Sequence, residues 1–394
     1  MAVLTGLDRL LHEENLFTRL KGKQIGLLVN PTSVTQDLVH GIEALLAKGV
    51  EITRLFGPEH GVRAEAQDME AVQETRDPLT GIACVSLYGH TFESLSPARE
   101  DLEELDLVIC DIQDIGARYY TYVYTIGLMM EACGKAGVEV LILDRPNPIN
   151  GLTIEGNLLK EDCRSFVGMQ ALPNRHGMTV GELARFFDTY CGWSCDFEVV
   201  KMKGWKRSMW FDDTGLPWVM PSPNMPTLDT AIVYPGQCLL EGTNLSEARG
   251  TTRPFELFGA PYCDATVLGE YLEGLSIPGV RYRLASFRPK FQKHANQTCK
   301  GLQIHVTDRA AFPSLSLSYG IIAAFLAIHP DEFAWREEAY EFVTDQLAID
   351  LLFGDKAIRP QLEAGANPIE LANSFRKELR PFLEARQKCL LYHD

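Results

Sequence analysis

The first half of the chain alternates between short apolar runs and segments with helical spacing. Six runs of strand character lie at residues 23–30, 51–56, 81–89, 105–116, 138–149 and 195–205. Helical segments at 37–49, 120–137 and 178–192 lie between them, and each ends at a glycine. Strands that are apolar on both faces and alternate with helices form a parallel sheet covered on both sides. The pattern therefore predicts a doubly wound, Rossmann-like α/β domain.

The second half follows a different pattern. Prolines concentrate at 216–230, and we place a domain boundary near residue 230. Beyond it the spacing predicts a helix at 265–275, strands at 280–287 and 301–308, and three further helical stretches. A chain of 394 residues is too long for one ordinary core. The prediction is a Rossmann-like domain at 1–230 and a smaller α+β domain at 231–394.

Polar residues follow the predicted strands, which is where parallel sheets bind ligands. Asn30 comes after the first strand, Glu59 and His60 after the second, Asp114 after the fourth and Asn147 after the fifth. In the motif GPEHG, glycines and a proline fix the presentation of the Glu–His pair. A turn with two solvated side chains explains that motif about as well as a catalytic carboxyl does.

The stretch DIQDIGARYYTYVYT at 111–125 offers an arginine and several tyrosines near a helix start. Tyr119 and Tyr120 have flat faces and hydroxyls that suit a sugar ring, although tyrosines at these positions also pack on a sheet. Arg118 and Arg145 are candidates for binding an anion, and Arg145 could equally pair with the neighbouring Asp144.

Two later segments add further candidates. Arg175 and His176 precede a helix that opens with Thr179 and Glu182, a pair that matches a capping box, so we interpret Glu182 as structural. The segment 241–256, EGTNLSEARGTTRPFE, is dense in polar residues and is either a linker or part of a site. Its candidates, with the asparagine of PSPNMPT, are Glu241, Asn244, Glu247, Arg249 and Asn224.

The composition of the chain and the absence of several motifs exclude some classes of function. A net charge of −16 disfavours nucleic acid and anionic membranes as partners. No run is long enough to cross a membrane, the N-terminus lacks a secretory pattern, and the ten cysteines suit a reduced interior, so we expect a cytoplasmic protein. The chain lacks the glycine motifs of dinucleotide and P-loop sites and the G-x-S-x-G nucleophile elbow. It also lacks pairs of residues at the spacing of metal ligands on one face of a helix. Carboxyls, arginines, asparagines and tyrosines remain, a set suited to carbohydrate chemistry.

Six motifs occur in one order along the chain: GPEHG, DIQDIGARYYTY, DRPNPING, LPNRHGMTVGEL, PSPNMPT and YPGQCLLEGTNLSEARGTTRPFE. In these motifs the sequence closely resembles the exo-β-N-acetylmuramidase family over nearly its whole length. The resemblance implies an active site between a Rossmann-like domain and a smaller domain that closes the cleft. It also implies hydrolysis of β-linked N-acetylmuramic acid (MurNAc) from the non-reducing end of peptidoglycan fragments, without a cofactor or metal.

The glutamate of the family's PEHG motif falls on Glu59, which the resemblance makes the favoured general acid, with His60 beside it. Asp114 or Glu247 is our candidate for the second catalytic role. An arginine fork suits the lactyl carboxylate of the sugar, and we favour Arg118 and Arg249. Two alternatives stay open: a non-catalytic protein that binds an anionic cell-wall sugar, and a muropeptide amidase or esterase.

Overall fold

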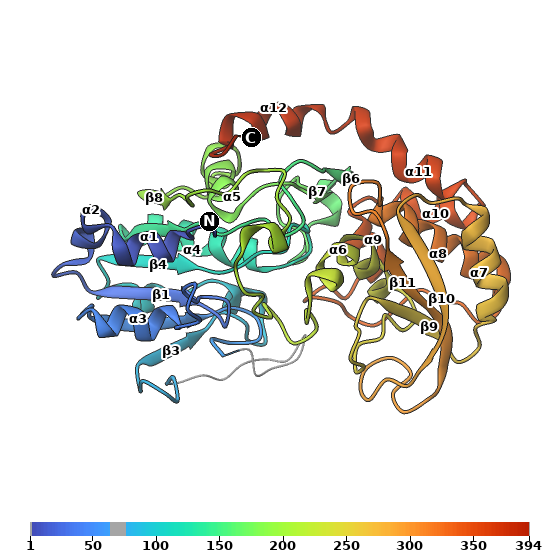
Figure 1. Cartoon of the computed structure of the whole chain (residues 1–394), viewed down its shortest axis with the longest axis horizontal. Coiled ribbons are helices and arrows are strands. Elements are labelled where there is room, and N and C mark those ends of the chain that lie inside the picture. The colour runs from blue at the N-terminus through green and yellow to red at the C-terminus, as the bar shows by residue number, and fades with distance from the viewer. Residues whose placement is uncertain (1, 64–75, 394) are drawn as a thin grey trace.

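The computed structural model describes residues 2–63 and 76–393. A six-stranded sheet forms the centre of the first domain, in the order β3-β2-β1-β4-β5-β8, and every neighbouring pair is parallel (Figure 1). The strands are β1 (Ile25–Val29), β2 (Ile52–Gly57), β3 (Ala83–Ser86), β4 (Leu107–Asp111), β5 (Glu139–Leu143) and β8 (Phe197–Val200). All six predicted strands and the doubly wound order are confirmed. The order reverses between β1 and β4, the position at which such sheets leave a crevice for ligands.

Alternation of side chains along the strands gives this sheet a core on each face. Leu28 of β1 packs into one core, while Leu27 and Val29 pack into the other. The first core also receives α4 and part of α5, and the second receives α1 and α3. The helices are α1 (Gly6–His12), α2 (Glu14–Phe17), α3 (Gly41–Ala47), α4 (Tyr122–Ala136) and α5 (Val180–Phe186). Because both faces are covered, all residues of β1 and β4 are buried, as their continuous apolar runs predict.

The smaller second domain is built on a three-stranded antiparallel sheet in the order β10-β11-β9. Its elements are α6 (Leu228–Gln237), β9 (Leu257–Ala260), α7 (Ala265–Gly274), β10 (Val280–Phe287), β11 (Cys299–Val306), α8 (Ser314–Ile328), α9 (Ala348–Phe353), α10 (Ile358–Glu363) and α11 (Pro368–Ser374). A last helix, α12 (Arg380–Cys389), follows them and contacts α5 of the first domain. The prediction is confirmed for α7, β10 and β11, but it missed α6 and β9. That strand has only four residues, and its Gly259 lies so close to β11 that a side chain would not fit.

Another antiparallel pair, β6 (Glu155–Leu158) and β7 (Pro173–Arg175), lies in the first domain. It was not predicted, because the two segments are short and lack alternating apolar residues. The predicted final helical stretch is divided into α11 and α12, and Pro381 stands in the first turn of α12, where a proline is tolerated.

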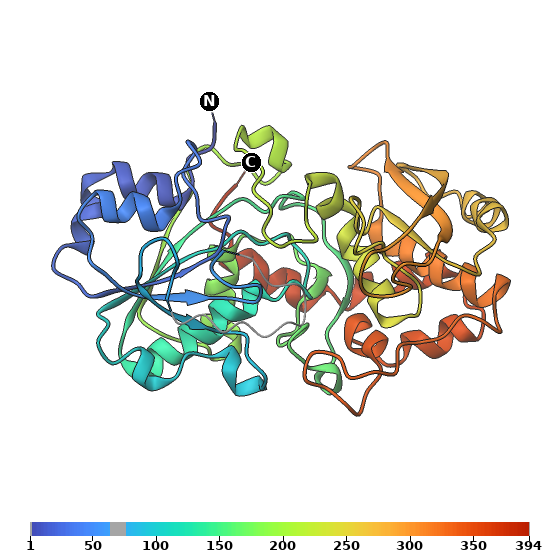
Figure 2. The ribbon, with the colours of Figure 1, turned by 90° about the horizontal axis from the view of Figure 1, so that it is seen from below.

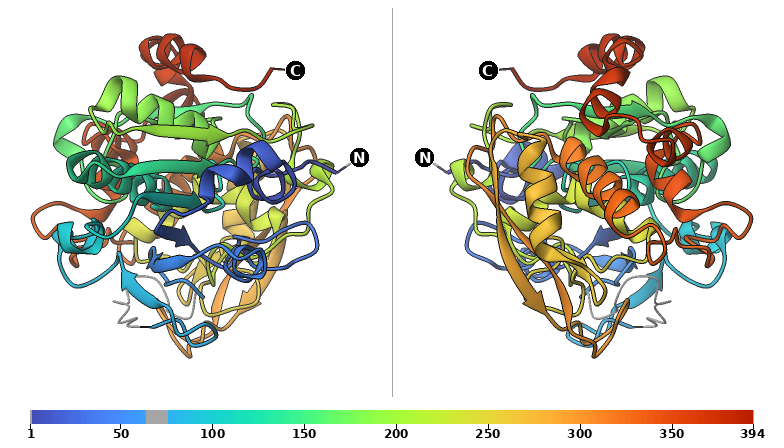
Figure 3. Two further views of the ribbon diagram at one scale, coloured as in Figure 1. Left: turned by 90° about the vertical axis from the view of Figure 1, so that its left-hand side faces the viewer. Right: turned by 90° about the vertical axis from the view of Figure 1, so that its right-hand side faces the viewer.

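The last helix returns to the first domain. In Figure 1, α12 runs across the top of the molecule, and Figures 2 and 3 place both chain ends on the same side. Arg185 of α5 donates hydrogen bonds to the backbone carbonyls of Cys389 and Leu390. Val3 and Tyr392 belong to one small apolar cluster. The two ends of the chain therefore meet on the first domain.

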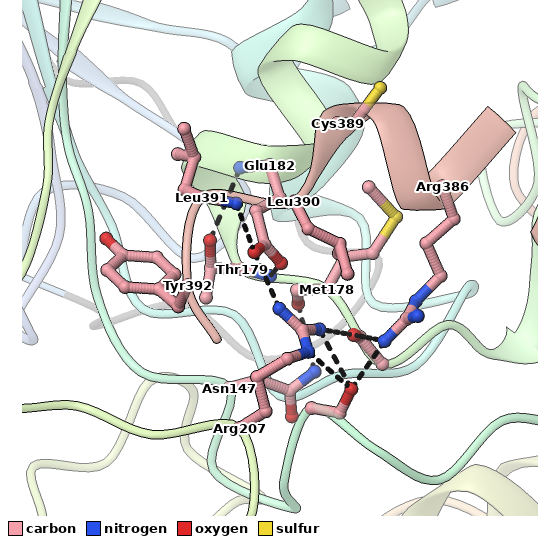
Figure 4. Close-up of polar contacts among 12 residues, drawn as sticks. Asn147, Met178, Thr179, Glu182, Arg207, Arg386, Cys389, Leu390, Leu391 and Tyr392 are labelled. Atoms are coloured by element: carbon pink, nitrogen blue, oxygen red, sulfur yellow. Dashed lines mark hydrogen bonds and ion pairs between the residues drawn. The ribbon is translucent and has the colours of Figure 1, made fainter. Parts of the chain in front are cut away.

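Buried charges hold this C-terminal tail in place (Figure 4). Arg207 donates to Glu182 at 2.6 Å, and the backbone N–H of Leu391 donates to the same carboxylate oxygen at 2.9 Å. Thr179 and Glu182 form the predicted capping box of α5, so the structural interpretation of Glu182 is confirmed. The Tyr392 hydroxyl donates to Asp144 at 2.5 Å. Burial raises the pKa of Asp144 to about 7, although that hydrogen bond lowers it.

Candidate functional site

A pocket of about 540 Å³, its mouth included, lies between the two domains at the carboxyl edge of the central sheet. The first domain contributes Glu59, His60, Tyr119, Tyr120, Thr121, Tyr122 and Val167. Ser222, Asn224 and Met225 come from the connecting segment, and Tyr234, Glu241, Arg249, Phe255, Tyr340 and Glu341 come from the second domain. Carboxyl groups and tyrosines dominate this lining.

Glu59 is presented by a tight turn after β2. The Gly61 N–H donates to the Pro58 carbonyl at 2.9 Å, and His60 and Gly61 both have positive φ, at 72° and 86°. A positive φ is uncommon for a residue other than glycine, and two in succession make the chain turn sharply directly after Glu59. The Glu59 side chain is 7% exposed and accepts a hydrogen bond from Thr121 Oγ1 at 2.8 Å. Its carboxyl is therefore sheltered, and it is oriented from the start of α4.

Tyrosines from the start of α4 form one wall of the pocket. The ring of Tyr120 lies 5.0 Å from that of Tyr122 and 5.8 Å from that of Tyr234, in edge-to-face contacts. Burial raises the pKa of Tyr120 and of Tyr122, so both phenols stay protonated at neutral pH. The Tyr119 hydroxyl donates to the Pro235 carbonyl, which joins the two domains at this wall.

Glu241 forms the charged wall on the second domain. It accepts from Arg249 at 2.9 Å and from the Tyr340 hydroxyl at 2.8 Å. Arg249 also lies 3.9 Å from Glu247, which pairs with Lys293 at 2.7 Å. Arg249 and Tyr340 therefore hold the Glu241 carboxyl in a fixed orientation.

A loop of the second domain, Tyr340 to Phe342, closes one side of the pocket, and we call it the 340–342 loop. Glu341 and Phe342 have positive φ, at 46° and 68°, which is a strained conformation for two consecutive non-glycine residues. The loop is anchored on the first domain. The Tyr88 hydroxyl donates to Glu341 at 3.1 Å, and the Phe342 ring lies 5.9 Å from that of Tyr88 and 6.5 Å from that of Phe166.

Part of the predicted site comes together in this pocket. Seven of the predicted residues line it: Glu59, His60, Tyr119, Tyr120, Asn224, Glu241 and Arg249. Asp114 and Glu247, the candidates for the second catalytic role, do not line it. The Asp114 carboxylate accepts from the Gly116 N–H at 2.7 Å and faces His176 at 3.2 Å, behind the tyrosine wall.

Three predicted anion-binding arginines lie outside the pocket. Arg118 is fully buried, and its guanidinium donates to four backbone carbonyls, which leaves no room for a substrate carboxylate. Arg145 forms a bidentate pair with Asp111, at 2.6 and 2.8 Å. Arg175 pairs with Glu155 at 2.7 Å. These arginines hold loops and domains together.

The remaining residues predicted to bind substrate also contact other parts of the protein instead. Asn30 accepts from the Thr32 N–H at 3.0 Å, and Asn147 donates to the Met178 carbonyl at 2.9 Å. His176 is fully buried beside Asp114. Asn244 donates to the Glu332 carbonyl at 2.7 Å. Each side chain shapes the backbone near the pocket without lining it.

Sequence reasoning missed Tyr340 and Glu341. They lie in the unremarkable stretch EEAYEFV, nearly 100 residues beyond the polar cluster that holds Glu241. The only local signal is a tyrosine beside a glutamate, which is too common to identify a site. Among the described residues, no group of three or more His, Cys, Asp or Glu side chains could hold a metal ion. Within the same ranges, no helix is long and apolar enough to cross a membrane.

Family models match both parts of the chain. The model described as the N-terminal part of the exo-beta-N-acetylmuramidase NamZ matches residues 25–229, and the model of its C-terminal part matches residues 232–392. The chain belongs to the exo-β-N-acetylmuramidase family. This membership confirms the resemblance read from the motifs and makes the chain a glycosidase.

A curated relative and two crystal structures agree with this assignment. The muramidase chain is 44% identical to the peptidoglycan beta-N-acetylmuramidase NamZ of Bacillus subtilis, over 99% of this chain and 91% of the relative. It resembles the crystal structure of a DUF1343 family protein from Bacteroides fragilis, with a TM-score of 0.88, 34% identity and 99% of each chain covered. A second DUF1343 protein of that organism has a TM-score of 0.76 and 27% identity, with both chains fully covered.

Proposed function

We propose that this muramidase releases β-linked MurNAc from the non-reducing end of peptidoglycan fragments such as MurNAc bound to N-acetylglucosamine (MurNAc-GlcNAc). The relative from Bacillus subtilis is named for that sugar and polymer. The observation that carries the proposal is the sheltered carboxyl of Glu59 in a pocket that also contains Glu241 and Arg249. Two carboxyl groups with different partners are what glycoside hydrolysis requires.

In this mechanism Glu59 is the general acid that protonates the leaving oxygen. Thr121 holds the carboxyl from one side, and His60 lies beside it in the lining. A general acid must come within hydrogen-bond reach of the leaving oxygen, and Glu59 lines the pocket in which a bound glycoside would lie.

We assign the second catalytic role to Glu241. It lines the pocket and pairs with Arg249, whereas Asp114 and Glu247 do not line the pocket. An ionised carboxylate stabilises the positive charge that develops on the sugar ring, or orients the group that attacks it. Arg249 is our candidate partner for the lactyl carboxylate of the sugar, and Tyr120 for its ring face.

A product assay tests the activity. The protein is incubated with MurNAc-GlcNAc and, separately, with GlcNAc-MurNAc, and free sugars are identified by mass spectrometry. We expect free MurNAc from the first disaccharide and no cleavage of the second. Intact MurNAc-GlcNAc after hours of incubation would refute the proposal.

We also infer a cytoplasmic location, in which the substrates are imported sugar fragments. This inference depends on the ten cysteines, which suit a reduced interior. All ten cysteines are free thiols in the structure, and eight of them are buried. Cell fractionation tests the location, and activity in the culture medium or cell envelope alone would contradict it.

A further inference from the structure

A second hollow, of about 790 Å³ with its mouth included, lies on the first domain. Its lining includes Phe92, Arg164, Met169, Gln170, Tyr190 and Trp193, and we call it the aromatic groove. Phe92 is 43% exposed and Tyr190 is 42% exposed. Large aromatic side chains usually bury most of their surface, so two exposed rings in one hollow indicate a binding surface.

The rings of the aromatic groove are held from behind by other aromatic residues. Tyr190 lies 5.3 Å from Phe186, and Trp193 lies 5.2 Å from Phe187. Phe92 lies 6.3 Å from Phe342 in an edge-to-face contact. Each ring therefore has a fixed orientation before any ligand binds, which lowers the entropic cost of binding.

The backbone around the aromatic groove has two unusual features. Helix α5 ends in a π-helical turn, Phe187–Cys191, which carries Tyr190 outward. Such turns are rare and occur frequently at functional sites. In α4, a side chain at Gly127 would come within 2.3 Å of the Trp193 ring, so this glycine leaves space for the floor of the groove. A glycine inside a helix destabilises that helix by about 1 kcal/mol relative to alanine. The space that the Trp193 ring needs explains why a glycine stands here.

The aromatic groove adjoins the catalytic pocket at two places. Met169 lines the groove and Val167, two residues earlier, lines the pocket, so one short segment separates the two hollows. Phe92 of the groove contacts Phe342, whose neighbour Glu341 lines the pocket. The two hollows are therefore neighbours, separated by one short segment and by the 340–342 loop.

We propose that the aromatic groove binds the sugar rings that follow the cleaved bond in longer peptidoglycan chains. This inference rests on the proposed function. The apolar C–H face of a pyranose stacks on an aromatic ring, and Arg164 and Gln170 supply donors for hydroxyl and acetamido oxygens. A glycan strand carries apolar ring faces and polar edges along its whole length, so it can contact both the aromatic rings and the polar side chains of the groove.

Chain-length dependence tests this proposal. The value of kcat/KM is measured for MurNAc-GlcNAc and for peptide-free, MurNAc-terminated chains of four and six sugars. We expect the wild-type protein to prefer the longer chains by about tenfold, from two aromatic contacts. Tyr190→Ala and Phe92→Leu should each lower that preference to about threefold and leave the disaccharide rate within about twofold, because neither residue lines the pocket. Leucine at position 92 keeps apolar contact with Phe342. The matched control is Leu284→Ala, which changes another exposed apolar side chain, on β10 of the second domain.

Several outcomes would overturn the proposal. One is a wild-type protein that cleaves all three chains with equal efficiency, and another is an unchanged length preference in both groove variants. If the variants lose activity only on peptide-bearing fragments, the occupant is the stem peptide and the glycan assignment is wrong. If the protein cleaves none of the chains, the proposed function fails instead. The groove is then tested by calorimetric titration with a GlcNAc tetramer, and binding that is absent, or equal in wild type and Tyr190→Ala, overturns it.

Discussion

Replacing Glu59 with glutamine should separate binding from bond cleavage. Glutamine has the same shape and still accepts the hydrogen bond from Thr121, which is 2.8 Å from the carboxylate in the structure. The fold and the affinity for substrate are therefore kept, and KM should change by less than about threefold. The proton for the leaving oxygen is lost, and general-acid catalysis typically contributes ~10²–10⁴-fold. We expect kcat to fall by that factor, which corresponds to about 3–5 kcal/mol of activation free energy.

The leaving group supplies a chemical control for this prediction. An aryl glycoside of MurNAc with an acidic phenol departs without protonation, so Glu59→Gln should lose far less activity on it than on MurNAc-GlcNAc. Thr121→Val removes one hydrogen bond to the carboxyl and should cost roughly 1.5–3 kcal/mol, or at least tenfold in kcat/KM. Rates are followed by phenol release and by chromatography of free MurNAc.

Two results would refute the reasoning. If Glu59→Gln kept more than a tenth of wild-type kcat on the disaccharide, Glu59 would not be the acid. If it lost equal activity on both kinds of leaving group, its role would lie in a different step. In that case Glu341, which also lines the pocket, would become the next candidate to replace.

Three further predictions concern the 340–342 loop, acid stability and the C-terminal tail. Phe342→Ala removes the ring contacts with Tyr88 and Phe166 that anchor the loop, so kcat/KM should fall roughly tenfold, which steady-state kinetics measure. Burial by itself raises the pKa of Asp77, but hydrogen bonds from Arg63 and Thr80 lower it to about 2. Asp77 therefore contributes roughly 2 kcal/mol to the free energy of unfolding above pH 4, and this contribution is lost as pH falls toward 2. Asp77→Asn should remove that part of the acid dependence of unfolding. Tyr392→Phe removes the hydrogen bond to Asp144 and should lower stability by about 2 kcal/mol, measured by calorimetry.

Each of these predictions has a contrary result. Unchanged kinetics in Phe342→Ala would mean that the loop needs no aromatic anchor. An identical pH dependence of unfolding in Asp77→Asn would mean that the Arg63 pair does not contribute. A wild-type melting temperature in Tyr392→Phe would mean that the tail is held by its other contacts, such as the pairing of Leu391 with Glu182.

The sheet was predictable because its strands are apolar on both faces. A run such as IGLLV, with every residue buried, has few alternatives in a chain that alternates strands with helices. The short strands β6, β7 and β9 lack that signal, because their positions depend on contacts with distant segments. Local pattern therefore identified the long elements and missed the short ones.

The candidate site was predictable only in part, for a physical reason. A polar residue at the end of a strand can bind either a ligand or the loops of its own chain. Arg249 lines the pocket while Arg118 donates to four backbone carbonyls, yet both follow glycine-rich or acidic stretches. Glu341 enters the pocket through a contact with Tyr88, 253 positions earlier, and nothing local marks such a partner.

The route of the C-terminal tail has a consequence for synthesis of the protein. Tyr392 follows Asp144 by 248 positions in the sequence, and its hydroxyl meets Asp144 in the middle of the first domain. The Rossmann-like domain is therefore synthesised with part of its interior uncovered, and that gap is filled only after the second domain has been made. Proteins that bind nascent chains have a long interval in which to act on the uncovered surface.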